Sequence, residues 1–427
     1  MATEEEQVII EETNVSDFKS ILMLFLENID SICIAISLIM PILCKSAERS
    51  QKKLEDFENK YCEVTVLGEF TEVKVPFVHN KDYNKLRKRF TSYIISNNIV
   101  PQSLFMALIS NYDSFIGSLY KIILNKKPEI VNANKRNIEF KDLVKFSSIS
   151  EARDFIIDKE IESLLRQNHF DQLRELETKF SIKLTESNDC LKRFIEITER
   201  RNLYAHCNGI PSDQYFNVCL KHKCNISGVQ KKSRLDLTPK YFFESLFCVY
   251  ELAVKLTHIL WRKFIPEDMD EADSNLINIG YSLIEDEHYT LACRILDFAC
   301  CLPKHSSELN KLILIVNRAQ AYKWGGKKEE AQKILNEIDW SAKSNDFKLA
   351  HYVLMEDWEN AIDTMRLIGV GDDQTKVSYG NWPLYKEFRK TKIFLDTYKD
   401  IFSEEFSEES VTHDIKMKVT LPVEEHH

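Results

Sequence analysis

The chain carries at residues 191–209 the stretch LKRFIEITERRNLYAHCNG, and this stretch decides the predicted fold. Apolar residues recur in it at helical spacing between charged ones, which predicts an amphipathic helix over 191–206. The helix is expected to end there, because the Asn-Gly pair at 208–209 is a typical stop signal and Pro211 cannot continue a helix. His206 would then lie exposed at the rim of the helix.

Helical patterns continue on both sides of this stretch. Gly and Pro number only 10 each in 427 residues, which favours long helices with short connections. Apolar periodicity predicts further helices over 17–58, 81–97, 101–126, 149–158, 161–176, 239–264 and 384–402. Residues 207–240 are polar and basic and are expected to form a loop. The fold class predicted from these patterns is all-α.

One short β-hairpin is expected near the N-terminus. Val64 and Val66 alternate with other residues on one side of Gly68, and Val73 and Val75 do so on the other side. Such alternation across a glycine is typical of two antiparallel strands. The hairpin would be the minor β content of the protein.

Composition indicates a soluble cytoplasmic protein. The eleven cysteines follow no disulfide spacing, and residues 1–12 are acidic, unlike a secretory signal. The apolar run 32–44 is shorter than the roughly 20 residues of a membrane span, so we expect a buried helix bent near Pro41 and no membrane contact. The net charge of −10 argues against a general RNA-coating protein but leaves room for a local basic site.

The end of the 191–206 helix carries residue types that suit RNA cleavage without a metal. Such cleavage needs groups that take and give a proton, and a cation that stabilises the negative charge of the phosphorane. His206 would serve the proton transfers and Arg201 the phosphate, while Asn202 shares a helix face with His206. Because one helix supplies one histidine, two copies meeting across a two-fold axis would complete a site.

Residues 200–210, RRNLYAHCNGI, resemble the catalytic helix of the HEPN superfamily, which carries an Arg-polar-x-x-x-His motif at a helix end. The likeness covers about residues 100–265 in organisation and is specific only over about 190–217. It implies that His206 is the catalytic histidine, Arg201 the phosphate-stabilising arginine and Asn202 the residue that orients them. It further implies a metal-independent endoribonuclease without a cofactor, active as a homodimer in prokaryotic defence or toxin systems.

A basic segment supports an RNA site. Residues 219–240 carry a net charge of +5 within an acidic protein and would form a phosphate funnel if they fold back over the helix end. A solvated basic loop is the alternative. The residues predicted to contact RNA are Arg200, Lys221, Lys223, Lys231, Lys232 and Arg234. Cys219, His222 and Cys224 match no standard zinc spacing, so no metal is expected.

The C-terminal part shows weak internal repetition. Ala292, Ala331 and Ala361 are 39 and 30 residues apart, which brackets the tetratricopeptide period of about 34. Three helix pairs are therefore expected, forming an α-solenoid. The tryptophans Trp324, Trp340 and Trp358 would pack between their helices, with a peptide-binding groove as the alternative.

These patterns predict five regions. They are an acidic tail at 1–15, a helical region with the hairpin at 16–98, a HEPN-like domain at 99–266, tetratricopeptide-like repeats at 267–402 and an acidic tail at 403–427. The leading hypothesis is an endoribonuclease that acts as a toxin or effector, with repeats that sense a trigger or bind a protein partner. The competing hypothesis is a non-catalytic adaptor that dimerises and binds a protein, and a third is nucleotide binding in the cleft between helices.

Overall fold

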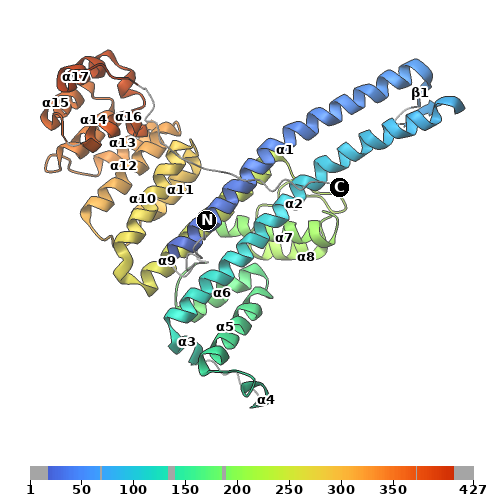
Figure 1. Cartoon of the computed structure of the whole chain (residues 1–427), viewed down its shortest axis with the longest axis horizontal. Helices are drawn as coiled ribbons and strands as arrows, with labels where there is room; N and C mark the ends of the chain where they lie inside the picture. The colour runs from blue at the N-terminus through green and yellow to red at the C-terminus, as the bar shows by residue number, and fades with distance from the viewer. Residues whose placement is uncertain (1–17, 68–69, 133–139, 185–188, 372, 408–427) are drawn as a thin grey trace, which may run out of the picture. The chain divides into compact units, whose positions relative to one another are not determined.

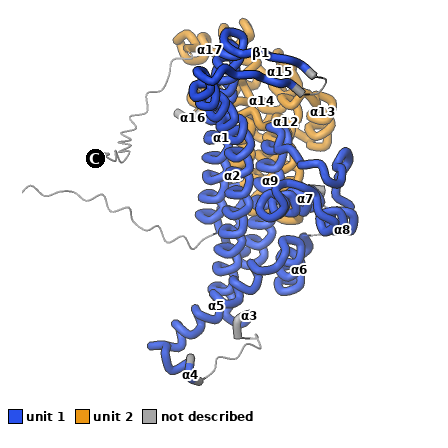
Figure 2. The backbone as a smooth tube through the Cα atoms, turned by 90° about the vertical axis from the view of Figure 1, so that its right-hand side faces the viewer, with its two compact units in different colours: residues 1–275 blue, residues 276–427 orange. Residues whose placement is uncertain are grey.

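The computed structural model describes residues 18–67, 70–132, 140–184, 189–371 and 373–407. They are mostly helical, with one small two-stranded sheet, which confirms the all-α class (Figure 1). The chain divides into two compact units, residues 1–275 and 276–427 (Figure 2). The predicted acidic tail 1–15, and residues 408–427 of the other tail, lie outside the described residues.

Two long helices form the framework of the first unit. α1 (Phe18–Tyr61) and α2 (Asn80–Lys126) run side by side, with Phe25 stacked on Phe115 at a centroid distance of 4.5 Å near one end. At the other end they are joined by β1 (Glu63–Leu67), β2 (Phe70–Lys74) and the 3-10 turn η1 (Phe77–His79). The strands pair antiparallel with Val64 opposite Val73, so the predicted hairpin is confirmed.

α2 corrects the prediction of two helices over 81–97 and 101–126. It runs without a break through Pro101, whose side chain is buried. Proline removes one helical hydrogen bond, but packing along α1 holds the backbone helical on both sides of it. The boundary predicted between residues 98 and 99 therefore falls inside a continuous helix, and the compact units divide inside α10 (Met269–Glu285).

The apolar run 32–44 lies within α1, which also continues through its proline, Pro41. One face of the run is buried, but Ile34, Leu38 and Ile42 are 60%, 63% and 65% exposed. α1 is the single helix among the described residues that is long and apolar enough to cross a membrane by length and composition. The expectation of a core helix is thus met on one face only.

Shorter helices pack against this framework. They are α3 (Pro128–Asn132), α4 (Phe140–Leu143), α5 (Ile149–Leu165), α6 (His169–Phe180), α7 (Asp189–His206), α8 (Asp213–Lys221) and α9 (Pro239–Phe264). α9 has the predicted bounds, with Thr238 as its N-cap. The predicted helix 161–176 is wrong, because the Asn168 side chain caps a new helix there and separates α5 from α6.

The second unit consists of helix pairs. After the 3-10 turn η2 (Pro266–Asp268), the pairs are α10 with α11 (Tyr289–Cys300), α12 (Glu308–Trp324) with α13 (Lys328–Asn336), and α14 (Asn345–Met355) with α15 (Trp358–Ile368). The three alanines singled out in the sequence are at most 2% exposed. A Cβ at Gly280 would lie 2.6 Å from the Leu296 side chain, so the glycine permits close helix packing. The assignment to tetratricopeptide repeats stays a prediction.

The end of the second unit differs in detail from the prediction. After α16 (Asp373–Asn381), the predicted helix 384–402 is replaced by the 3-10 turns η3 (Pro383–Tyr385) and η4 (Phe388–Lys390) and by α17 (Lys392–Phe402), which Thr391 caps. Trp340 is buried and Trp358 stacks on Phe388 at 5.2 Å, so these tryptophans pack in the core. Phe406, in the predicted tail, packs on α17.

Candidate functional site

α7 ends at His206, as predicted. The amide of Gly209 donates to the carbonyl of Leu203 at 3.0 Å, and Asn208 and Gly209 both have positive φ angles, 50° and 76°. A Cβ at Gly209 would lie 3.0 Å from the ring of Tyr204, so both the backbone and the packing favour glycine. The turn leaves the His206 side chain exposed and without a hydrogen bond to any other described residue.

The segment after α7 is not the simple loop that the sequence predicted. It contains the short helix α8, whose first turn is capped by the Ser212 side chain. The rest of the segment folds back on the end of α7, where the amide of Leu235 donates to the carbonyl of Gly209 at 2.9 Å. The Tyr204 hydroxyl donates to the carbonyl of Leu235 at 3.1 Å. Residues 234 and 235 of the basic segment therefore lie against the end of α7.

Arg201 is held by two side chains. It donates from Nη1 to Oδ1 of its neighbour Asn202 at 3.1 Å and from Nη2 to Oδ2 of Asp113 on α2 at 3.3 Å. The other oxygen of Asp113 lies 3.0 Å from Nε2 of His169, the first residue of α6. The Arg201 side chain remains 23% exposed, so its guanidinium is positioned but still reaches solvent.

Sequence reasoning missed both Asp113 and His169. Asp113 did carry a signal, because it is the single charged residue between Phe90 and Tyr120. An isolated charge on a helix that packs in the core needs a partner, and the structure supplies Arg201 and His169. His169 had no comparable signal, because its contact with α2 spans 56 positions of the chain.

Arg200 lies on a different flank of α7 from Arg201, because successive helical residues are about 100° apart. Its Nε donates to Oε1 of Glu196 at 2.8 Å, and its guanidinium lies 3.8 Å from the ring centre of Tyr241 on α9. Glu196 also accepts hydrogen bonds from the hydroxyls of Tyr215, at 2.7 Å, and Tyr241, at 2.5 Å. The Glu196 and Arg200 side chains are only 7% and 11% exposed.

The surroundings of Glu196 also change proton affinities. Burial raises the pKa of Tyr215, and the neighbouring carboxylate of Glu196 raises it further. Burial alone would lower the pKa of Arg200, but Tyr241 and Glu196 outweigh it and the net shift is upward. Arg200 is therefore a permanently charged member of a closed network, with one flank of its guanidinium covered by a ring.

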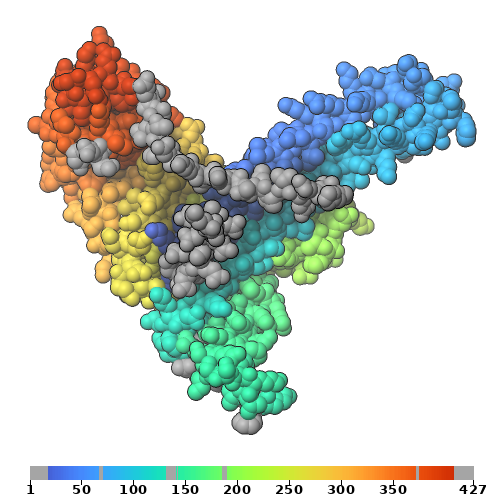
Figure 3. Space-filling view, in the orientation of Figure 1, coloured from blue at the N-terminus to red at the C-terminus, as the bar shows by residue number. Residues whose placement is uncertain are grey.

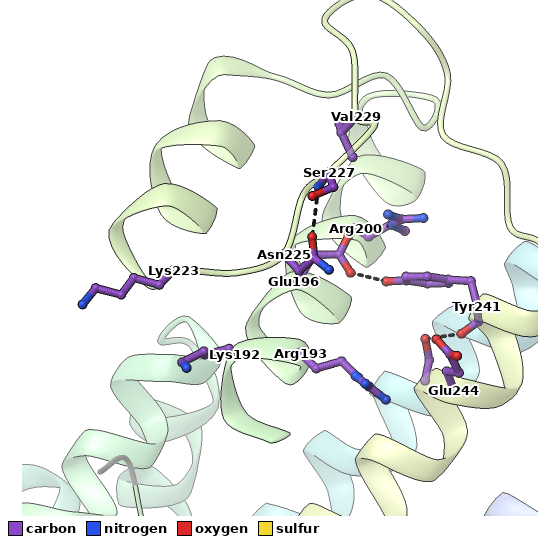
Figure 4. Close-up of a pocket in the computed structure, with 11 residues that line it drawn as sticks. Lys192, Arg193, Glu196, Arg200, Lys223, Asn225, Ser227, Val229, Tyr241 and Glu244 are labelled. Atoms are coloured by element: carbon purple, nitrogen blue, oxygen red, sulfur yellow. Dashed lines mark hydrogen bonds and ion pairs between the residues drawn. The ribbon is translucent and has the colours of Figure 1, made fainter. Parts of the chain in front are cut away.

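A pocket of about 580 Å³ opens beside this network (Figure 4). Its lining includes Arg200 and Lys223, two of the six residues predicted to contact RNA. Of the others, Arg234 packs its side chain against Gly209 at the end of α7, and Lys231 pairs with Asp213 at 2.7 Å.

The two remaining predicted RNA contacts, Lys221 and Lys232, are exposed and do not line the pocket. The structure thus distributes the six basic residues over several places instead of one funnel. Among the described residues, no three His, Cys, Asp or Glu side chains lie together as metal ligands.

Comparison with protein-family models, with curated proteins and with solved structures gives no match to this chain. What the site does is therefore argued from its own residues and their geometry.

Proposed function

We propose that the protein is a metal-independent endoribonuclease that acts as a homodimer, as an effector or toxin of a prokaryotic defence system. The observation that carries the proposal is the pairing of an exposed histidine, His206, with an arginine five residues earlier whose guanidinium is positioned by Asn202 and Asp113. The resemblance of residues 200–210 to the HEPN catalytic helix points to the same chemistry.

The proposed reaction is internal transesterification of RNA. One histidine takes the proton of a ribose 2′-hydroxyl, the 2′-oxygen bonds to the adjacent phosphorus, and the bond from phosphorus to the 5′-oxygen breaks. A second histidine gives a proton to the departing 5′-oxygen, which leaves a 2′,3′-cyclic phosphate and a 5′-hydroxyl. Arg201 stabilises the charge on the phosphoryl oxygens. His206 of each copy would supply one of the two proton-transfer groups.

An exposed apolar surface supports the dimer. Leu38 and Ile42 on α1, with Ile95 and Ile99 on α2, are 50–65% exposed. They lie along the two-helix hairpin whose outer part Figure 3 shows in blue. Exposed apolar side chains of this size are candidates for an association surface.

This apolar surface lies near the end of α7. Phe105, six residues along α2 from Ile99, packs edge-on against Tyr204 at 5.9 Å. A second copy seated on the surface would bring a second α7 end toward the first. A membrane is a poorer occupant, because the uncharged run 32–44 covers only about 20 Å of helix against roughly 30 Å of hydrocarbon.

A non-catalytic adaptor is the second candidate. The observation that favours it is the ion pair of Arg201 with Asp113. The carboxylate of Asp113 offsets the positive charge of Arg201, which would otherwise attract a phosphate. In this case unit 2 would bind a protein partner through its helix pairs, and the α7 end would serve dimerisation alone.

The test is cleavage of end-labelled RNA by purified protein in EDTA, with the molar mass measured in parallel. We expect His206→Ala to lower cleavage by about 10³-fold with an unchanged dimer, and the matched neighbour Cys207→Ala to leave both unchanged. Leu38→Asp, at an exposed position, should give a folded monomer without activity. Equal cleavage by the wild type and His206→Ala would refute the site, and a dimer that never cleaves RNA would favour the adaptor.

A further inference from the structure

The exposed face of α1 carries a pattern of side chains that is symmetric about Leu38. α1 is one unbroken helix, and buried residues such as Ile29, Ile36 and Ala47 lie along one side of it (Figure 1). At about 100° per residue, the nine residues between 24 and 52 that lie nearest to the line through Leu38 are on the opposite side, and all of them are exposed. We call them the α1 stripe: Leu24, Glu27, Ser31, Ile34, Leu38, Ile42, Lys45, Arg49 and Lys52.

Each residue of the stripe has a counterpart at the same distance on the other side of Leu38, so that the two residue numbers add up to 76. Ile34 corresponds to Ile42, which places an apolar side chain on each side of the centre. Glu27 corresponds to Arg49, so an acid matches a base. The two other pairs are Ser31 with Lys45 and Leu24 with Lys52. If two copies of this helix lie antiparallel about a two-fold axis at Leu38, each residue faces its counterpart in the other copy.

The charged residues of the stripe have no partner within the chain. Neither Glu27 nor Arg49 forms an ion pair with another described residue. They are separated by 22 residues of one helix, or about 33 Å, which is too far for them to bind each other in one copy. Between two copies, an antiparallel arrangement brings Glu27 to Arg49 twice. A parallel arrangement would instead set Glu27 beside Glu27 and Arg49 beside Arg49, where like charges repel.

The charges therefore identify the occupant of this face. The apolar centre, Ile34, Leu38 and Ile42, is 60–65% exposed and by itself would suit many apolar partners. A second copy of this chain is the partner for which the acid, the apolar centre and the bases all find a matching residue at the same time.

We propose that α1 pairs antiparallel with α1 of a second copy of this chain, with Leu38 of both copies at the two-fold axis and Glu27 of each copy bound to the partner's Arg49. Ile34 then packs against the partner's Ile42. The proposal deepens the proposed function, because it states how the second copy is held, and it rests on the dimer of that function but not on RNA cleavage. The stripe lies outside residues 100–265, to which the HEPN resemblance extends, so the resemblance implies nothing about it.

The experiment measures the dimer dissociation constant of the full chain by sedimentation equilibrium. Glu27→Lys and Arg49→Glu each turn two attractive pairs of the dimer into repulsive ones, and we expect each to weaken the dimer by at least about tenfold. The double variant Glu27→Lys/Arg49→Glu restores opposite charges and should dimerise within about threefold of the wild type. Glu55→Lys is the matched control, because it makes the same charge change at an exposed position about 100° from the line through Leu38.

A mixture of the two single variants gives a second test. In a mixed pair the introduced lysine faces the introduced glutamate, and the native Glu27 faces the native Arg49. Both contacts are attractive, so the equimolar mixture should associate about as tightly as the wild type although neither variant does so alone. No contact within one chain produces this recovery. All the substituted side chains are exposed, and circular dichroism checks that each variant is folded.

The proposal is overturned if the wild type is monomeric, if the single reversals dimerise as tightly as Glu55→Lys, or if the double variant is as weak as the single ones. RNA cleavage by the same samples is measured separately. A dimer that responds to the reversals as expected but cleaves no RNA supports the pairing and counts against the ribonuclease. RNA cleavage by a dimer whose dissociation constant is unchanged by the reversals supports the ribonuclease and overturns the pairing.

Discussion

The two flanks of α7 use adjacent arginines in different ways. On one flank Arg200 is buried, with its charge matched by Glu196 and its guanidinium covered by Tyr241. On the other flank Arg201 is about a quarter exposed and is held at its edge by Asp113 and Asn202. A cation that is nearly buried and paired with a buried carboxylate stabilises packing, whereas a positioned and solvent-reachable cation is available to a ligand. Arg200 and Arg201 are neighbours in the sequence, but they point to different flanks of α7. Arg200 therefore has a structural role, and the catalytic role is proposed for Arg201.

The carboxylates of α7 repeat this contrast. Glu196 accepts hydrogen bonds from three side chains. Glu199, one turn later, is also buried but accepts no hydrogen bond from a described residue. Burial raises the pKa of Glu199, and the nearby His169 opposes the shift. Substitutions at these positions should therefore have opposite signs.

The largest effect on stability is expected on the flank of α7 that carries Glu196 and Arg200. Glu196→Ala leaves the buried Arg200 guanidinium without its partner and should lower the free energy of unfolding by about 3–5 kcal/mol. Tyr215→Phe removes one of the three donors and should cost about 1–2 kcal/mol. Urea denaturation of the two variants beside the wild type measures both values. A loss below about 1 kcal/mol in Glu196→Ala would mean that Arg200 is solvated and the network is not closed.

Substitution of Arg201, on the other flank of α7, should change the cleavage activity and not the stability. Arg201→Ala should lower RNA cleavage by about 10²–10³-fold, because the negative charge on the phosphoryl oxygens loses its cation. The free energy of unfolding should change by less than about 1 kcal/mol, since its ion pair is partly exposed. Arg201→Lys should recover only part of the rate, because an ammonium lacks the guanidinium fork. If Arg201→Ala unfolds as readily as Glu196→Ala and cleaves normally, the two flanks have the same structural role.

The smallest effect is expected from Glu199→Gln and depends on pH. Because the pKa of Glu199 is raised in the folded protein, the unfolded chain ionises first, and the wild type loses stability as pH rises from about 4.5 through the folded pKa. The variant lacks this loss, so it should be more stable than the wild type at pH 7 and equal to it at pH 4. Thermal unfolding at the two pH values checks this. A variant less stable at pH 7 would show that the Glu199 carboxylate has a favourable partner.

How far the sequence predicted the fold depends on the element. The bounds of α7 and α9 follow from local signals, namely the Asn208-Gly209 stop and the Thr238 cap. α2 was predicted as two helices, because Pro101 is a local break signal that packing against α1 overrides. The split of 161–176 was missed because Asn168, a short polar residue within an apolar pattern, acts as a cap.

The sequence by itself determined the all-α class, the hairpin, the helix pairs of the second unit and the exposed end of α7 at His206. These features depend on periodicity and on stop signals, which act within a few residues. Only the tertiary structure decided that Arg201 meets Asp113 and His169, and that Arg200 instead joins Glu196 beside a pocket. The physical reason is that such contacts depend on which helices face each flank of α7, and their partners lie tens of residues away in the chain.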